Sequence, residues 1–287
     1  MKSKIFIFAA SLLLSGMIIT SCKQTAASID KENDIRFDSI IVNERYYLLG
    51  DSANPYCTLE AQFIYPSYYK DKNILNRLNR HFINSFFGED SISVTPEETM
   101  DKYVLKYITD YKELESDFIE ETRIFGEKPQ QESSYAYYEM SWNEILYNKC
   151  DLLSYTVSVD FYTGGAHGQQ GCNNFVIDLK TGNELEENDI FIENYQDDLS
   201  KIIVDAIALN NNVADPLELE DMGFFNVEEI YPNNNFYVNE DGITYTFNRY
   251  EIAAYFVGII EVTLPFDKIR HLMLENSPVA PLVFTGK

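Results

Sequence analysis

Residues 153–179 read LSYTVSVDFYTGGAHGQQGCNNFVIDL and carry the clearest structural pattern in the chain. Apolar and polar residues alternate up to a glycine-rich segment, residues 164–171, and an apolar run follows it. Alternation with a period of two is typical of a β-strand that buries one face. The stretch therefore predicts two antiparallel strands joined by a loop, with the polar face, from Ser154 to Asp160, turned to solvent.

The glycine-rich segment has four glycines in eight residues. Such a density indicates backbone angles that other residues avoid, or the close approach of another segment. It is not a phosphate-binding loop, because no Gly-Lys-Ser/Thr follows and it joins strand to strand. His167 lies at its tip, where a lone histidine can bind a metal ion, act as a base or only form a hydrogen bond.

Residues of this loop and its flanks are our candidate ligand contacts. Two plainer interpretations stay open: the glycines only make the turn, and the strand carboxylate is simply solvated. The candidates are Asp160, Tyr162, Gly164, Gly165, His167 and Gly168.

Helices and strands are expected on both sides of this hairpin. Residues 119–134 are charged, contain Gly126 and Pro129, and are expected to form a loop. Apolar periodicity predicts strands over 35–49, 57–65 and 257–264, a hairpin over 236–247, and helices over 74–86, 95–114, 199–207 and 266–274. The expected fold is α+β, with antiparallel sheets, helices packed on one face, and two consecutive subdomains, residues 35–130 and 131–287.

Sequence motifs of common catalytic and metal sites are missing. There is no G-x-S-x-G nucleophile elbow and no H-E-x-x-H pair, so no cofactor or metal site is predicted. Cys57, Cys150 and Cys172 show no C-x-x-C spacing and permit at most one internal disulfide. We expect them to act as small buried apolar side chains.

The amino-terminal residues have the order of a secretory signal. Lys2 and Lys4 precede an uncharged apolar run, residues 5–19, and Ile19-Thr20-Ser21-Cys22 follows. This end is similar to the lipobox of bacterial lipoproteins, which implies cleavage after residue 21 and a fatty acyl chain such as palmitate on Cys22. Residues 22–34 would then be a flexible tether in the cell envelope. The alternative is an uncleaved anchor.

Charge narrows the range of partners. The chain has a net charge of −24, and removal of the two signal-peptide lysines would bring it to −26. Such a surface repels nucleic acid and anionic lipid headgroups and attracts cationic partners. The alternative is that the charge serves solubility alone.

Two blocks of sequence resemble a known family. The run Tyr162-Thr163-Gly164-Gly165-Ala166-His167-Gly168 and the block from Tyr250 to Gly258 resemble the carboxy-terminal domain of the RsiV anti-sigma factors, with Ala254 where the family usually has proline. Upstream, Ile64-Tyr65-Pro66 and the helix after it are similar to the domain that precedes it in RsiV and in the PdaC peptidoglycan deacetylases. The resemblance covers residues 35–275.

The resemblance implies a domain that senses the cell wall. In RsiV this region binds lysozyme, and in PdaC it accompanies a separate catalytic domain. That catalytic domain needs Thr-Phe-Asp-Asp, whereas here Thr246-Phe247 is followed by Asn248-Arg249. The lipobox stands in place of the RsiV membrane helix, and Lys23 after the lipid cysteine favours the outer membrane.

We therefore expect a non-enzymatic envelope lipoprotein that binds peptidoglycan or a cationic muramidase of the lysozyme type, without a cofactor. The alternative is a peptidoglycan-modifying hydrolase or esterase that uses Asp160 and His167. A third possibility is a structural partner in a larger envelope complex.

Overall fold

The computed structural model describes residues 32–88, 95–128 and 134–284. The signal peptide, Cys22 and most of the expected tether lie outside these ranges. Glu32 and Asn33, at the end of that tether, already contact the first sheet, because Asn33 donates to the Leu152 carbonyl at 2.8 Å. Within the described ranges, no helix has the length and apolar character needed to cross a membrane.

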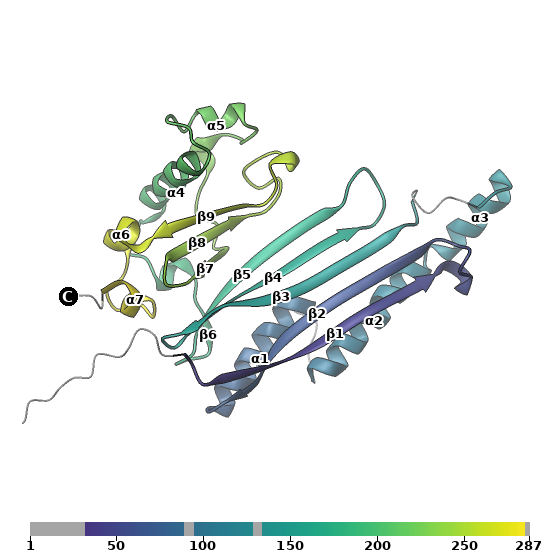
Figure 1. Cartoon of the computed structure of the whole chain (residues 1–287), viewed down its shortest axis with the longest axis horizontal. Helices are drawn as coiled ribbons and strands as arrows, with labels where there is room; N and C mark the ends of the chain where they lie inside the picture. Colours follow the sequence, from purple (N-terminus) through teal and green to yellow (C-terminus); the bar gives the residue numbers. More distant parts are fainter. Residues whose placement is uncertain (1–31, 89–94, 129–133, 285–287) are drawn as a thin grey trace, which may run out of the picture.

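A six-stranded sheet in the order β1-β2-β3-β4-β5-β6 forms the larger part of the fold (Figure 1). Its neighbouring strands are antiparallel except β2 and β3, which are parallel. The expectation of antiparallel sheets holds for the other strand pairs and is wrong for β2 and β3. Parallel neighbours need a long crossover, and three helices supply it here. The elements are β1 (Ile35–Tyr47), β2 (Tyr56–Tyr69), α1 (Lys72–Phe87), α2 (Pro96–Lys112), α3 (Glu115–Phe125), β3 (Tyr137–Lys149), β4 (Leu152–Tyr162), β5 (Gln169–Asp178) and β6 (Asn183–Glu184).

Sequence signals at the helix ends explain where the crossover helices begin and stop. The Asp71 carboxylate accepts from the Asn73 amide at 2.8 Å at the start of α1, and the Thr95 hydroxyl accepts from the Glu98 amide at 3.2 Å at the start of α2. α3 ends at Gly126, whose φ of 70° is left-handed. The expectation of a loop over 119–134 is therefore wrong for residues 119–125, because these residues belong to α3.

A three-stranded antiparallel sheet, β7-β8-β9, forms the second part of the fold. α4 packs against it in the apolar core, and the chain closes with short helical turns where a longer helix was expected. The elements are α4 (Gln196–Asn210), α5 (Glu218–Asp221), β7 (Phe236–Val238), β8 (Gly242–Phe247), β9 (Ile260–Pro265), α6 (Phe266–Ile269) and α7 (Ala280–Phe284). The mixed helix and sheet content and the two regions agree with the expected α+β class.

The expected division after residue 130 falls between α3 and β3. The six-stranded sheet continues across it, because Cys57 to Gln62 of β2 pair with Tyr137 to Trp142 of β3. Strands from both sides of the division therefore share one sheet.

The two faces of β4 meet different partners. Leu153, Tyr155 and Val157 face the core beneath α1, where the Tyr155 ring stacks on Phe82 at 4.0 Å. Ser154 and Thr156, expected in solvent, are buried under the second sheet. The Ser154 hydroxyl donates to the Val238 carbonyl of β7 at 2.7 Å. The expectation of a solvated polar face is therefore wrong for this half of the strand, because the second sheet covers it. The hydrogen bond offsets the cost of burying the Ser154 hydroxyl.

Asparagine side chains of the second sheet join it to β5. Asn248 accepts from the Cys172 amide at 2.8 Å and donates to the Cys172 carbonyl at 3.1 Å. Asn235 donates to the same carbonyl at 2.9 Å and accepts from the Asn174 amide at 2.8 Å. The two amides thus satisfy β5 backbone groups much as a neighbouring strand would.

The cysteines differ in environment. Cys57 is a buried free thiol, and burial raises its pKa to about 11, so it is protonated at neutral pH. Cys172 is a free thiol, half-exposed, with its sulfur 3.2 Å from the Thr156 hydroxyl. The expectation of a buried role therefore fits Cys57, but neither Cys150 nor Cys172, which are both half-buried.

A half-buried carboxyl beside α2 gives the fold a pH dependence. Glu139 on β3 accepts from the hydroxyls of Tyr103 and Ser141, and burial raises its pKa above 4.5. The unfolded chain therefore loses this proton at a lower pH than the folded chain. The free energy of unfolding should fall as the pH rises from about 4.5 through the raised pKa, and stay lower above it.

Glu139→Gln removes this titration while leaving an oxygen to accept from Tyr103. We expect the variant to be more stable than the wild type at pH 7 and to lose that advantage near pH 4. Thermal unfolding at both pH values measures this. An equal stability difference at the two pH values would contradict the assignment.

Candidate functional site

The glycine-rich loop connects β4 to β5 and places the candidate residues at one end of the large sheet. Asp160 pairs with Gln170 in the β4–β5 register. Its carboxylate accepts from the Gln170 side chain at 2.7 Å and from the Tyr138 hydroxyl at 3.0 Å. Burial, and then the hydrogen bond to Asp160, raises the pKa of Tyr138. Asp160 is thus held between two donors rather than free in solvent.

Glycines give the loop its shape in two different ways. Gly164 and Gly165 have φ of 86° and 102°, which side chains disfavour. The Gly165 carbonyl then accepts from the Tyr162 hydroxyl at 2.8 Å. Gly168 permits close approach instead, since a Cβ there would lie 2.8 Å from the Tyr138 hydroxyl and 3.2 Å from the Phe161 carbonyl.

Gly165→Ala isolates the backbone effect, because a Cβ at this position meets nothing within 4 Å. The positive φ alone should lower the free energy of unfolding by about 1–2 kcal/mol. Chemical denaturation measures the loss, and Ala166→Gly in the same loop is the control. No change in the alanine variant would mean that the loop relaxes freely to another conformation.

His167 at the tip of the loop lies against the segment that joins β8 to β9. Its Nδ1 is 3.0 Å from the Gly168 carbonyl, which can only accept, so this nitrogen carries the proton. Its Nε2 faces the Tyr250 hydroxyl at 3.5 Å, and its ring stacks on Tyr255 at 4.0 Å.

Tyr255 fastens the glycine-rich loop to the segment that joins β8 to β9. Its hydroxyl donates to the Gly168 carbonyl at 2.8 Å, and the Arg249 guanidinium lies over its ring at 4.3 Å. We call His167, Gly168, Arg249, Tyr250 and Tyr255 the clamp. Sequence reasoning missed Tyr138 and the clamp residues Arg249, Tyr250 and Tyr255. The block from Tyr250 to Gly258 resembles a known family and could have indicated these residues. The sequence pattern alone, however, does not show which loop this block contacts.

Exposed apolar side chains continue from the clamp across the surface. Tyr250 is 57% and Phe256 77% exposed. Met222 and Phe225 are also exposed and lie on the neighbouring segment, since the Phe225 amide donates to the Ile252 carbonyl at 2.9 Å. We call these four residues the apolar patch. Exposed apolar groups of this kind often mark a binding surface.

Asp160 and His167 have separate hydrogen-bond partners. Among the described residues, no hydrogen bond or ion pair joins Asp160 to His167, and each has other partners. A general base must lie within hydrogen-bond reach of the group it activates. The hydroxyl nearest to Asp160 is that of Tyr138, at 3.0 Å, and His167 faces the Tyr250 hydroxyl at 3.5 Å. In the described ranges, no three His, Cys, Asp or Glu side chains are grouped so as to hold a metal ion.

Comparison with known proteins identifies two regions. A family model described as a protein of unknown function (DUF3298) matches residues 188–267, and one described as deacetylase PdaC matches residues 53–170. The loop lies at the end of the second match and Arg249 to Tyr255 lie in the first, so the clamp joins the two matched regions. No curated protein matches the chain.

Two solved structures are similar over most of the chain. A DUF3298 protein from Bacteroides fragilis is 31% identical, with a TM-score of 0.83, and the match covers 89% of this chain and 100% of that one. A DUF3298 protein from Pseudomonas aeruginosa is 13% identical, with a TM-score of 0.54, and covers 88% and 98%; it supports the fold alone. Given its identity to the Bacteroides protein over that protein's full length, the chain belongs to the DUF3298 family and contains a PdaC-like region.

Proposed function

We propose that the chain is a non-enzymatic extracytoplasmic binding protein, held in the envelope by a lipid on Cys22, and that its clamp and apolar patch bind a cationic protein of the lysozyme type. The observation that carries the proposal is the apolar patch, which the clamp fixes in place. Rigid exposed aromatic residues are enriched among the residues that dominate protein–protein binding.

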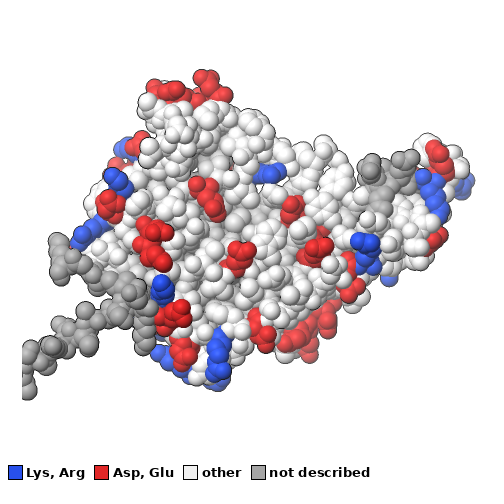
Figure 2. Space-filling view, in the orientation of Figure 1, with Lys and Arg blue, Asp and Glu red and all other residues white. Residues whose placement is uncertain are grey.

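Charge supports a cationic partner. The chain has 46 acidic and 22 basic residues. Figure 2 shows carboxylates scattered over a largely uncharged face and gathered over α5, with few basic groups between them. Such a field accelerates the encounter with a basic protein and weakens as salt is added.

Retention of lysozyme by the immobilised protein tests the proposal. We expect retention at low ionic strength that decreases, without vanishing, at high ionic strength, because the apolar patch is insensitive to salt. No retention at low salt would contradict the lysozyme proposal. Purified wall fragments assayed in parallel should show no turnover, and turnover lost in Asp160→Ala with His167→Ala would favour the hydrolase.

A second candidate ligand, peptidoglycan, is favoured by a different surface. A shallow groove of about 270 Å³ crosses β1 to β3, where Asn43, Gln62 and Glu60 surround Met140 and Trp142, the single tryptophan of the chain. Amide, carboxylate and aromatic groups together suit a sugar chain. Sedimentation with purified peptidoglycan, lost in Trp142→Ala and kept in Phe256→Ala, would support this ligand.

A further inference from the structure

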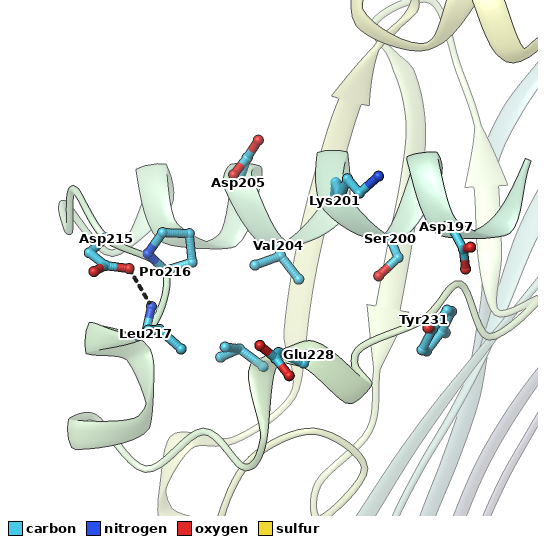
Figure 3. A pocket seen from close by; sticks show the side chains of 11 residues that line it. Asp197, Ser200, Lys201, Val204, Asp205, Asp215, Pro216, Leu217, Glu228 and Tyr231 are labelled. Atoms are coloured by element: carbon cyan, nitrogen blue, oxygen red, sulfur yellow. Dashed lines mark hydrogen bonds between the residues drawn. The ribbon is translucent and has the colours of Figure 1, made fainter.

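A cleft of about 630 Å³ lies between α4 and residues 215–231, on the second part of the fold (Figure 3). This volume is in the range of small-ligand sites. Val204 points into the hollow from α4 and Glu228 lies across from it. Leu217 and Tyr231, 55% and 48% exposed, contribute apolar surface to the lining.

Four carboxylates border this cleft: Asp197 and Asp205 on α4, and Asp215 and Glu228 on the opposite side. Within the described ranges, no lysine or arginine forms an ion pair with any of them. Lys201 also lines the cleft, but its ammonium lies 3.2 Å from the carboxylate of Asp198, which is outside the lining. The cleft therefore has an unbalanced negative charge beside an apolar surface.

The carboxylates are spread out rather than gathered at one point. Asp197 and Asp205 are eight positions apart on α4, which separates their backbones by about 12 Å along the helix axis. In the described part of the chain, no three acidic, histidine or cysteine side chains are grouped so as to hold one metal ion. A compact divalent cation needs several oxygens around a single centre, so it does not fit this lining.

We propose that the cleft binds an organic polycation of the polyamine class, in which ammonium groups are separated by methylene chains. The separated ammonium groups would face the separated carboxylates. The methylene chains would lie on Val204 and Leu217, and the Tyr231 ring can attract an ammonium group through its face. This site is independent of the clamp and of the function proposed for it.

Calorimetric titration of the full chain with spermidine at low salt tests the site. We expect one molecule to bind per chain. Asp197→Asn with Glu228→Gln should weaken binding at least tenfold, because it removes a carboxylate from each wall. The matched control is Asp101→Asn on α2 with Glu113→Gln directly after it. This double variant removes the same charge from exposed positions elsewhere and should change the affinity less than twofold.

The alternatives have distinct outcomes. An equal loss of spermidine affinity in both double variants would show a diffuse charge effect and overturn the proposal. Displacement of spermidine to the same extent by magnesium chloride and by sodium chloride at matched ionic strength would overturn it for the same reason. Binding of a trilysine peptide without binding of spermidine would also overturn it, in favour of a basic peptide. Leu217→Ala should weaken spermidine binding and leave the folded circular dichroism spectrum unchanged. Retained affinity in this variant would argue against the apolar part of the site.

Discussion

A chain in which Asn235 and Asn248 are both alanine should be less stable to unfolding by about 2–6 kcal/mol. The two side-chain amides satisfy the amide and carbonyl groups of Cys172 and the amide of Asn174 on β5. Alanine leaves these backbone groups without their partners, and water can reach only some of them. As the variant unfolds, we expect the second sheet to separate from β5 before the rest of the fold is lost.

Chemical denaturation with hydrogen exchange at Cys172 and Asn174 would measure both effects. Asn173→Ala is the matched control, because Asn173 lies between these residues on β5 and its side chain is exposed. If the double variant were as stable as this control, the asparagines would not be what holds the second sheet to β5.

Phe82→Ala should cost about 3–5 kcal/mol of stability. Phe82 on α1 is fully buried and stacks on Tyr155 of β4 with the ring centres 4.0 Å apart. Its ring also lies against Phe37 of β1. Removing it opens a cavity between the crossover helix and the sheet, and strands from both sides of residue 130 line that cavity.

Phe82→Leu keeps most of the volume and should lose far less, about 1–1.5 kcal/mol. Urea denaturation of both variants at pH 7 provides the comparison. Similar losses in the alanine and leucine variants would mean that the ring stacking, rather than the filled volume, dominates this part of the core.

Much of the fold could be predicted from local pattern. Strands with one apolar face, such as β1 and β4, and helices with a marked cap, such as α2 after Thr95, follow directly from residue periodicity. Residue periodicity could not show which strands pair or which sheets pack together. The parallel contact between β2 and β3 depends on how three helices cross the sheet, and burial of Ser154 depends on a second sheet more than 80 residues later.

In the candidate site, too, local features could be predicted from the sequence and long-range contacts could not. Glycine density correctly predicted an unusual loop, and Gly164 and Gly165 have the positive φ that it implies. Tyr255, however, is 87 residues from the Gly168 carbonyl that it binds. Such a contact comes from the docking of two sheets, and residue spacing does not encode it. The roles of Asp160, Tyr162, Gly164, Gly165, His167 and Gly168 in ligand binding stay a prediction.

The clamp makes one surface from the two matched regions, and the asparagine contacts join the DUF3298 match to β5 residues that lie between the matches. The loop belongs to the PdaC-like match, while Arg249 and Tyr250 belong to the DUF3298 match. We therefore expect neither region alone to present the apolar patch in its observed position.

The most direct test of this account is calorimetric titration of lysozyme into Phe256→Ala and Phe125→Ala. Both remove a phenylalanine that is more than 70% exposed, but Phe256 lies in the apolar patch and Phe125 at the end of α3. We predict that Phe256→Ala weakens binding at least tenfold, about 1.4 kcal/mol, and that Phe125→Ala binds like the wild type. Equal affinities for the two variants would contradict the proposal that the apolar patch is the binding surface.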